Sequence, residues 1–485
     1  MKNLEEVFCD TGRPTYTYVQ PTEYLQTKVA LRTPGKGVVI EGPSGIGKTT
    51  CLLATLDDLG YNARQLLSAR KKEDREKIEK ILANSRDAGL VIIDDFHKLE
   101  DNLKSEIADL LKTAAEERRN DVKLVLIGIN NAGDHLINIS PDLNDRIETI
   151  KFGVATDQQI NQLVDKGERA LNIKIEDREN LIRYSMGSFH IAQLLCHTLC
   201  ILSDIDVEQD KEYQIKIAAN VAVENRMNTL ARTFSEARLK FALGNRNKRR
   251  GLLPYYSLLR RIGESNGTVS LSLLYIKEPK RKASFQQIIN KGYLSQLINN
   301  NEQLNRLFFF DKGSKNLSVD DPKFLFFLRN TDWNSWEKEQ GFIPDDKYSY
   351  DFAISFSGKV RDIAKKLADK MLEEEISIFY DEQESAYILG NDVEQYLAPI
   401  YASDSRFVVP IIDDTYAEHV WTRFEQDQYR YRFDEKSVIP IILSSYHERN
   451  NDPLLKIGVI KLNQDKDLDA GINHAVDLLK QKIEE

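Results

Sequence analysis

Several features are scarce or missing in this sequence, and each absence excludes a class of protein. Four cysteines in 485 residues are too few for a disulfide framework, and no further Cys or His pair completes a zinc set with Cys196 and Cys200. No apolar run approaches the ~20 residues of a membrane span, and the N-terminus has no apolar core of the signal-peptide type. We therefore expect a protein of the reducing cytoplasm, with no membrane as a partner.

A net positive charge and internal repeats are missing as well. The formal net charge is −9, which argues against a chain that coats nucleic acid through its overall field, although a local basic patch stays possible. No repeat with a period of about 20–50 residues occurs, so the chain is not a solenoid. Its length predicts about three domains at ~150 residues each.

One glycine-rich stretch carries the strongest chemical signal. Residues 41–50 read EGPSGIGKTT and satisfy the pattern GxxxxGK[ST], after an apolar run at 37–40 and before a helix-like segment at 49–59. The glycines let consecutive N–H groups point at one anion, and the helix N-terminus adds partial positive charge. Lys48 can then reach the outer phosphates, while the Thr49 hydroxyl can ligate Mg²⁺. The predicted ATP-binding residues are Gly42, Ser44, Gly45, Gly47, Lys48, Thr49 and Thr50.

Two acidic residues follow the next strong apolar run. Residues 90–95 end in Asp94 and Asp95, as a buried parallel strand does when its carboxyl end lies at a ligand crevice. In that position Asp94 would hold Mg²⁺ and Asp95 would orient the attacking water. A further buried strand at 122–128 leads to Asn130, a polar side chain placed to sense the γ-phosphate.

The order of these motifs resembles the AAA+ and STAND group of P-loop ATPases. The series continues with Asp145 and Arg146 before a strand at 147–152, and the resemblance covers roughly the first 200 residues. It implies that Arg146 reaches the nucleotide of a neighbouring subunit, although a surface arginine in a turn fits equally well. It also implies a helical lid over 155–204. There His190 stands where the family often has an arginine, so we expect a structural histidine.

The middle of the chain, residues 206–330, carries no catalytic motif, and its short strands and helices predict a winged helix. It contains two basic clusters, Arg246, Lys248, Arg249 and Arg250, then Lys277, Lys280, Arg281 and Lys282. A winged helix with basic residues can bind DNA. In the resembled STAND proteins it mostly packs against the nucleotide domain, and we favour that interpretation. The polar segment 331–347, with Gly341 and Pro344, predicts a linker.

From Tyr348 onwards, strands alternate with helices, which predicts a small parallel doubly wound sheet. The segments YDFAISFSG at 350–358, IFYDEQE at 378–384 and WTRFE at 421–425 resemble a TIR domain of the bacterial branch, over 348–485. The sequence departs from that family where Leu389 replaces a usual tryptophan. It departs again after the strand at 441–443, which is followed by serines rather than by charged residues.

This second resemblance implies an enzyme that cleaves NAD⁺ at the nicotinamide–ribose bond. The family uses a glutamate four residues after a tryptophan, here Glu425 and Trp421, and this i, i+4 spacing puts both on one helix face. The carboxylate stabilises the oxocarbenium-like state that forms as nicotinamide leaves. Phe356 and Asp381 would line the pocket. Other TIR domains are scaffolds without catalysis, and that alternative stays open.

Together the motifs predict an α/β protein: a P-loop doubly wound sheet, a helical lid, a winged-helix domain and a flavodoxin-like TIR domain. The predicted boundaries are 1–153, 154–205, 206–330, 331–347 and 348–485. By family analogy we expect an ATP-gated immune effector that forms a homo-oligomer in response to an unknown trigger or sensor partner, for which a phage component is one candidate, and then depletes NAD⁺. The alternatives are a TIR scaffold on an ATPase switch and a DNA-linked ATPase regulator.

Overall fold

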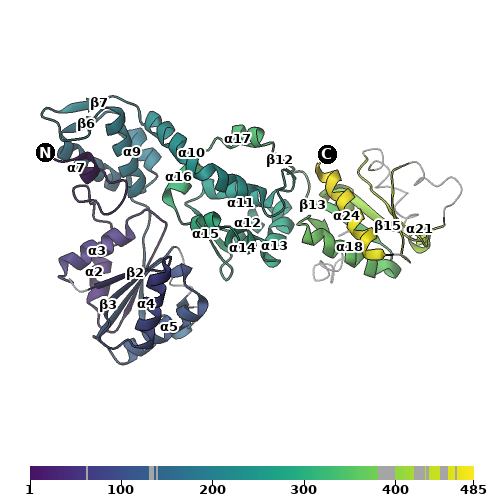
Figure 1. Ribbon diagram of the computed structural model, residues 1–485, viewed down its shortest axis with the longest axis horizontal. Helices are drawn as coiled ribbons and strands as arrows, with labels where there is room; N and C mark the ends of the chain where they lie inside the picture. Colours follow the sequence, from purple (N-terminus) through teal and green to yellow (C-terminus); the bar gives the residue numbers. More distant parts are fainter. Residues whose placement is uncertain are drawn as a thin grey trace.

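The computed structural model describes the chain except residues 62–63, 130–135, 138–139, 381–398, 420–431, 433–435, 448–456, 465–466 and 485. The molecule is elongated: a sheet domain and a group of helices lie at one end, a middle domain at the centre, and a second sheet domain at the other end (Figure 1). None of the described helices is long and apolar enough to cross a membrane.

The N-terminal sheet is parallel and five-stranded, in the order β2-β3-β4-β1-β5. Its strands are β1 Gly37–Glu41, β2 Arg64–Ser68, β3 Gly89–Asp94, β4 Val122–Ile127 and β5 Ile147–Lys151. Side chains alternate between two cores: Val38 and Ile40 pack with α2 (Tyr24–Arg32) and α3 (Lys48–Asp58), whereas Val39 packs with α4 (Lys72–Ala83) and α5 (Asp101–Glu116). Helices on both faces confirm the predicted doubly wound sheet.

The group of helices beside this sheet forms one hydrophobic core with the middle domain. Its elements are α1 Leu4–Val7, α7 Asp157–Leu171, β6 Ile173–Ile175, α8 Arg178–Ser185, α9 Phe189–Leu202, β7 Tyr213–Ile215 and α10 Ala219–Leu243. The first residues of the chain belong here, although we expected them within the N-terminal sheet domain. The reason is an apolar cluster, since Leu4, Val7 and Phe8 are buried in this core. The Phe8 ring lies so close to Gly167 that a Cβ there would be 2.1 Å from it.

The middle domain combines helices with an antiparallel three-stranded sheet in the order β10-β11-β9. Its elements are β8 Arg250–Gly251, α11 Pro254–Glu264, β9 Thr268–Ser270, α12 Leu271–Lys277, α13 Lys282–Asn290, α14 Tyr293–Asn299, α15 Glu302–Leu307, β10 Phe308–Asp311, β11 Asn316–Val319 and α16 Pro322–Arg329. These are parts from which a winged helix can be built, and that assignment stays a prediction.

Residues 331–347, expected as a linker, are folded onto the middle domain. They form α17 (Trp333–Gln340) and β12 (Ile343–Pro344), and β12 pairs in parallel with β8. Trp336 and Phe342 are buried, and both stack on Tyr256, with ring centroids 6.2 and 5.2 Å away. Two aromatic side chains thus anchor this segment to the middle domain. The polar composition of the rest of the segment had suggested a linker.

The C-terminal sheet is parallel and five-stranded, in the order β14-β13-β15-β16-β17. Its elements are β13 Tyr350–Phe356, α18 Arg361–Glu373, β14 Ile378–Phe379, a π-helical turn Ile400–Asp404, β15 Ser405–Ile412, α21 Asp414–His419, β16 Ile441–Leu443, β17 Ile460–Leu462 and α24 Leu468–Glu484. Helices α18 and α24 share a core with one face of the sheet. On the other face Tyr401 packs with Ala353 and Val408, and its hydroxyl donates to the Ile354 carbonyl. This confirms the predicted second doubly wound sheet.

Candidate functional site

The glycine-rich loop connects β1 to α3 at the carboxyl end of the N-terminal sheet. Gly45 and Gly47 have φ of 79° and 91°, a conformation that favours glycine. The loop is also crowded, since a Cβ at Gly45 would lie 2.7 Å from the Pro322 side chain. The Lys48 ammonium donates to the carbonyls of Gly42 (2.8 Å) and Pro43 (2.7 Å). Lys48 is therefore held over the loop where phosphates would lie.

Burial lowers the pKa of Lys48 to about 8, because it removes water from the ammonium. The carboxylates of Asp94 and Asp95, at the end of β3, oppose that shift. The Thr49 hydroxyl donates to Asp94 Oδ2 over 3.0 Å, and burial, with the charge of Asp95, raises the pKa of Asp94. Thr49 and Asp94 thus present adjacent oxygens, the ligand type that Mg²⁺ prefers, and so they fit the predicted cation.

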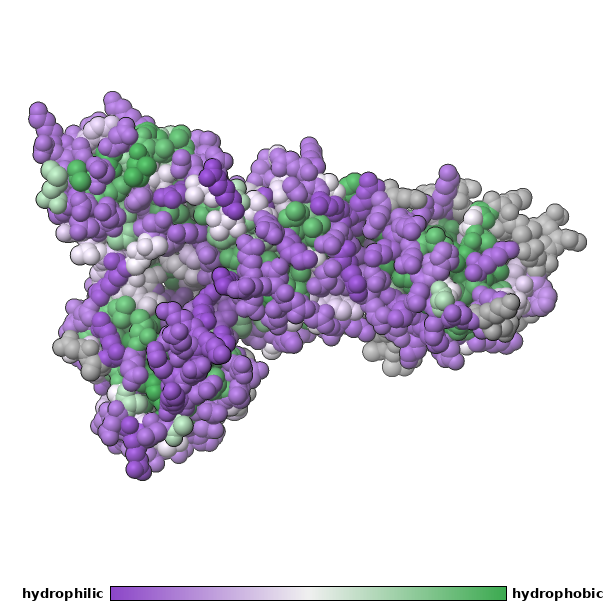
Figure 2. All heavy atoms as spheres, in the orientation of Figure 1, coloured by the Kyte–Doolittle hydropathy of each residue, from purple (hydrophilic) through white to green (hydrophobic). Residues whose placement is uncertain are grey.

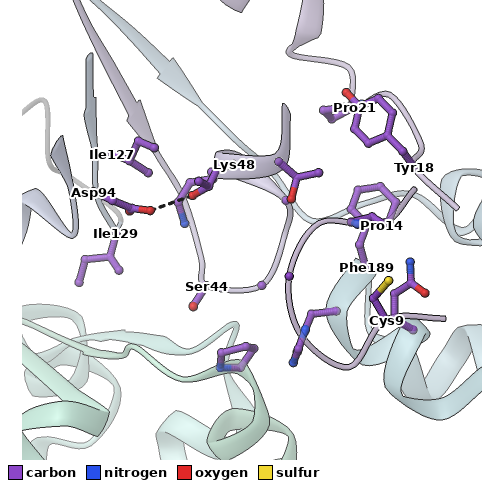
Figure 3. A pocket seen from close by; sticks show the side chains of 18 of the residues that line it. Cys9, Pro14, Tyr18, Pro21, Ser44, Lys48, Asp94, Ile127, Ile129 and Phe189 are labelled. Atoms are coloured by element: carbon purple, nitrogen blue, oxygen red, sulfur yellow. Dashed lines mark hydrogen bonds between the residues drawn. The ribbon is translucent and has the colours of Figure 1, made fainter. Parts of the chain in front are cut away.

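A cavity of about 310 Å³ surrounds Lys48 and continues away from the acids. Figure 2 shows the molecule hollowed between the sheet domain and the helices above it. One wall comes from the P-loop, including Ser44 and Thr50. Others come from residues 9–21, from α9 and from the segments that follow β3 and β4. Figure 3 shows Lys48 and Asp94 on one side, and Pro14, Tyr18 and Phe189 on the other. No sequence motif marks these rings as part of a nucleotide site, so they were not predicted.

A buried carboxylate of the middle domain reaches the same cavity. Asp320 Oδ2 lies 2.8 Å from Lys98 Nζ, 3.2 Å from an Arg70 nitrogen and 3.3 Å from His97 Nε2. Arg70 also contacts Asp95 Oδ2, at 2.9 Å. Burial alone would raise the pKa of Asp320, but His97, Lys98 and Arg70 hold it well below its usual range. We call this set of residues the Asp320 clasp. It links the middle domain to the acids of β3, and sequence reasoning missed it.

The other predicted residues of the N-terminal part lie in different places. Arg146 precedes β5 at the amino end of the sheet, where its carbonyl accepts from the Gly37 N–H, and its guanidinium pairs with Glu116 at 3.0 Å. It is thus at the edge opposite its own P-loop. His190 lines the cavity, and its backbone N–H donates to the Gly45 carbonyl over 3.3 Å. Asn130 lies outside the described residues.

In the C-terminal domain, Phe356 ends β13 at the carboxyl edge of the sheet. Its ring stacks on Tyr380 with centroids 5.5 Å apart, and the Arg361 guanidinium lies 5.2 Å from its centroid. The serines on either side of Phe356 are tied to the region of α21: Ser355 and Tyr416 share a hydrogen bond between their hydroxyls, and the Ser357 hydroxyl donates to Asp413. Asp381, Trp421 and Glu425 lie outside the described residues. Of the predicted NAD⁺ pocket, the structure therefore describes only Phe356.

Family models match two parts of the chain. Residues 38–153 match the ATPase family associated with various cellular activities (AAA), and residues 352–476 match the TIR domain. The chain contains an AAA domain and a TIR domain. The segments matched are those that hold the P-loop and Phe356.

Among curated proteins, the chain is 29% identical over 121 residues to the 3′ cyclic ADP-D-ribose synthase AaTIR of Aquimarina amphilecti, covering 25% of this chain and 37% of that protein. It is 38% identical over 86 residues to the Holliday junction branch migration complex subunit RuvB of Synechococcus sp. (strain CC9902), covering 18% and 23%. The chain thus spans well under half the length of these relatives.

Two solved structures resemble the chain in outline. The Thermotoga maritima RuvB Holliday junction branch migration motor has 14% identity and a TM-score of 0.34, covering 65% of this chain and 99% of its own. The Aeropyrum pernix ORC1 protein in complex with DNA has 13% identity and a TM-score of 0.34, covering 69% and 98%.

Proposed function

We propose that this protein cleaves NAD⁺ with its TIR domain under the control of a nucleotide bound to its AAA domain. The observation that carries the proposal is the similarity to a 3′ cyclic ADP-D-ribose synthase, within a chain that also holds a P-loop cradle. Making a cyclic ADP-ribose from NAD⁺ requires breakage of the nicotinamide–ribose bond. We assign that step to Glu425, with Trp421 one helical turn earlier.

The chemistry asks for a carboxylate beside the ribose. As nicotinamide leaves, positive charge grows on the ribosyl carbon, and Glu425 stabilises that state more than the ground state. Phe356 supplies an aromatic wall, in contact with Tyr380 and Arg361. Asp381 completes the pocket by family resemblance. The product is linear or cyclic ADP-ribose, according to whether water or the adenine end attacks.

Gating is supported by the position of the Asp320 clasp. ATP is held with Mg²⁺ by Lys48, Thr49 and Asp94, and it brings several negative charges into the cavity that Asp320 lines. Phosphate oxygens compete with the Asp320 carboxylate for Arg70 and repel it. Nucleotide binding therefore biases the position of the middle domain.

The contact between the middle and TIR domains supports transmission of that bias. Tyr255 and Asn245 donate to the Glu375 carboxylate over 2.7 and 2.8 Å, while the Lys248 ammonium donates to the Glu375 carbonyl over 2.6 Å. Tyr293 donates to the Leu372 carbonyl over 3.0 Å. We call this the Glu375 contact. Through this contact, a shift of the middle domain moves the TIR domain as well. In the proposed active state, several copies of the chain bring their TIR domains together. A role in antiphage defence rests on family analogy.

The basic clusters of the middle domain do not favour the DNA-linked alternative. Lys248 contacts Glu375, Arg246 pairs with Glu374 at 3.5 Å, and Arg281 pairs with Asp346. These cations thus contact acids and carbonyls of the same chain.

The test is NAD⁺ consumption by the purified full-length chain at high concentration, with and without ATP. Glu425→Gln should lower the rate by ~10²–10³, because the nearly isosteric amide loses the charge that faces the ribosyl cation. Asp427→Asn, two residues further along, is the matched control and should keep the parent rate. If Glu425→Gln consumes NAD⁺ as fast as the parent, the catalytic assignment is wrong and the scaffold interpretation takes its place.

A further inference from the structure

Two buried serines flank Phe356 at the carboxyl end of β13. Successive residues of an extended chain point to opposite faces of a sheet, so Ser355 and Ser357 share one face while Phe356 lies on the other. The Phe356 ring packs against the core that contains α18 and α24. Both serines point instead toward α21, where the Ser355 hydroxyl shares a hydrogen bond of 2.9 Å with that of Tyr416.

Asp413 joins the second of these serines to the first turn of α21. One oxygen of its carboxylate, Oδ1, accepts from the Ser357 hydroxyl over 3.1 Å and from the Tyr416 N–H over 2.7 Å. Phe356 pairs with Ile411 in the register of the sheet, so Asp413 and Ser357 both lie just beyond the last pair of strand residues. Asp413 and Ser357 are each only 5% exposed, so little water competes for their hydrogen bond.

Helix α21 leads to the residues to which we assign NAD⁺ cleavage. It spans Asp414–His419, and Trp421 and Glu425 come next in the sequence. The proposed pocket therefore needs two segments of the chain at once, the end of β13 with Phe356 and the segment that α21 begins. Asp413 is hydrogen-bonded to both of these segments.

We propose that Asp413 is a positioning residue for NAD⁺ cleavage, which holds Phe356 in a fixed place relative to the segment that contains Trp421 and Glu425. A carboxylate stabilises the ribosyl cation only when the ribose is held beside it, and an error of about 1 Å in such a geometry can lower a rate by ~10²-fold. Asp413 acts through Ser357 and the start of α21 rather than on the substrate. The inference rests on the proposed cleavage of NAD⁺ by the TIR domain.

The experiment measures kcat and KM for NAD⁺ in the full-length chain, and Ser357→Ala is its first variant. This change removes one hydroxyl but leaves the bond from the Tyr416 N–H to Asp413, so the start of α21 is retained. We expect kcat to fall about 10- to 100-fold while KM changes less than about threefold, because the lost alignment matters most in the transition state.

The matched control is Ser405→Ala, at the amino end of β15. The Ser405 hydroxyl is also buried and donates to the Ile400 carbonyl over 2.8 Å. Loss of either buried hydroxyl should lower the melting temperature by a similar amount. Only Ser357→Ala should lower kcat, and this difference separates positioning from a purely structural role. Equal losses of kcat in the two variants, or a parental kcat in Ser357→Ala, would overturn the proposal.

Variants of Asp413 itself separate its hydrogen bonds from its charge. Asp413→Asn keeps an oxygen that accepts both bonds, so its kcat should stay within about threefold of the parent value. Asp413→Ala should lose at least as much as Ser357→Ala, and if it does not fold, the comparison of the two serine variants decides. A kcat of Asp413→Asn far below that of Ser357→Ala would overturn the positioning role and indicate that the charge is needed. No consumption of NAD⁺ by the parent chain would instead overturn the proposed function, and the role of Asp413 with it.

Discussion

The Lys48 ammonium interacts with its own loop, donating to the carbonyls of Gly42 and Pro43. These bonds hold the charge within the cradle, next to Asp94 and Thr49. An incoming phosphate thus meets a charge that is already in place, and little side-chain freedom is lost on binding. The same geometry explains why Lys48 tolerates partial burial, since its hydrogens have partners.

Lys48→Ala should lose ATP binding. A hydrogen bond to a charged group contributes about 1.5–3 kcal/mol, so the dissociation constant should rise by at least about 10- to 100-fold. Titration of labelled ATP checks this, with Lys112→Ala as a control because Lys112 pairs with exposed Asp142 away from the cavity. In cells the variant should also lose NAD⁺ depletion. Undiminished depletion would show that the AAA domain does not gate the TIR domain.

At the scale of single residues, the sequence predicts what is contiguous and misses what folding brings together. The P-loop and the pair Asp94–Asp95 lie in short motifs, so their proximity follows from parallel strands that end at one edge. Asp320 is 250 residues from Arg70, and the pattern around it shows only a helix start before Pro322. Arg70 follows β2, an edge strand with only Leu67 fully buried, so its apolar signal is weak. Trp421 and Glu425 lie outside the described residues, so their assignment stays a prediction.

Among the elements, the turn between β11 and α16 carries two neighbouring acids with different tasks. Asp321 caps α16 by accepting from the N–H groups of Lys323 and Phe324. The Asp320 side chain points the other way and contacts the remaining members of the Asp320 clasp. It has no exposed surface there. A helix start therefore fixes the position at which the middle domain contacts the cations of the AAA domain.

Asp320→Asn should loosen this contact, because it removes the carboxylate charge that faces Lys98 and one of the two carboxylate charges that face Arg70. Breaking a buried pair on one side costs about 3–5 kcal/mol, which should appear as faster amide hydrogen exchange in α16 and after β2. The matched control is Asp321→Asn, which should change little because Asn caps a helix as well as Asp does.

The pH dependence of this effect has a defined sign. The folded pKa of Asp320 lies below its unfolded value of about 3.9, so its contribution is fully present above that value. It is lost as pH falls through the folded pKa. After correction for the intrinsic pH dependence of exchange, the parent should keep higher amide protection factors than Asp320→Asn at both pH 6 and pH 8. A difference that disappears at pH 8 would contradict the clasp.

The C-terminal end of α18 is capped by another domain. The last carbonyls of a helix lack partners within it, and here Tyr293 donates to Leu372 and Lys248 to Glu375 just beyond the helix. The positive charge of the Lys248 ammonium also interacts favourably with the negative end of the helix dipole. Glu375 has a φ of 56°, a strained conformation for this residue that the surrounding bonds maintain.

Glu375→Ala should weaken the attachment of the TIR domain. It removes the carboxylate that accepts from the Tyr255 hydroxyl and from the Asn245 amide, at about 1–3 kcal/mol, although Asn245 keeps its bonds to the Tyr255 hydroxyl and the Tyr293 carbonyl. Proteolysis between α17 and β13 should become faster, and NAD⁺ cleavage without a trigger should rise if the contact restrains the TIR domain. Glu373→Gln is the control, because that side chain is largely exposed and its ion pair is with Lys370 of the same helix. An unchanged cleavage pattern would show that the contact carries no restraint.

Element prediction succeeded where burial is continuous. The apolar runs of β1, β3 and β4 read as strands from the sequence, because central parallel strands are covered on both faces. It failed for β17, three residues with only the outer two buried. It also failed for α17 and β12, since two aromatic residues in a polar segment do not make a periodic pattern.

Across the whole molecule, the middle domain takes part in the Asp320 clasp and in the Glu375 contact. The Asp320 clasp lies at the start of α16, and the Glu375 contact uses residues of α11, α14 and the segment after α10. Helices α10, α11 and α16 share one hydrophobic core, and Figure 1 shows them between the two sheet domains. Packed interiors transmit strain rather than absorb it, so the middle domain can move as one body.

A double-mutant cycle tests that rigidity. Asp320→Asn and Glu375→Ala lie in different interfaces and share no contact, so independent effects on the rate of NAD⁺ cleavage would multiply. If the two contacts restrain one rigid body, either variant alone releases much of the restraint and the second adds little. The coupling should then be about 0.5–3 kcal/mol, measured from cleavage rates of the four proteins at one ATP concentration. Glu373→Gln in place of Glu375→Ala gives the control cycle, which should show no coupling. A product of the two single effects would mean that each contact acts alone, and that the nucleotide controls the TIR domain by a route outside the middle domain.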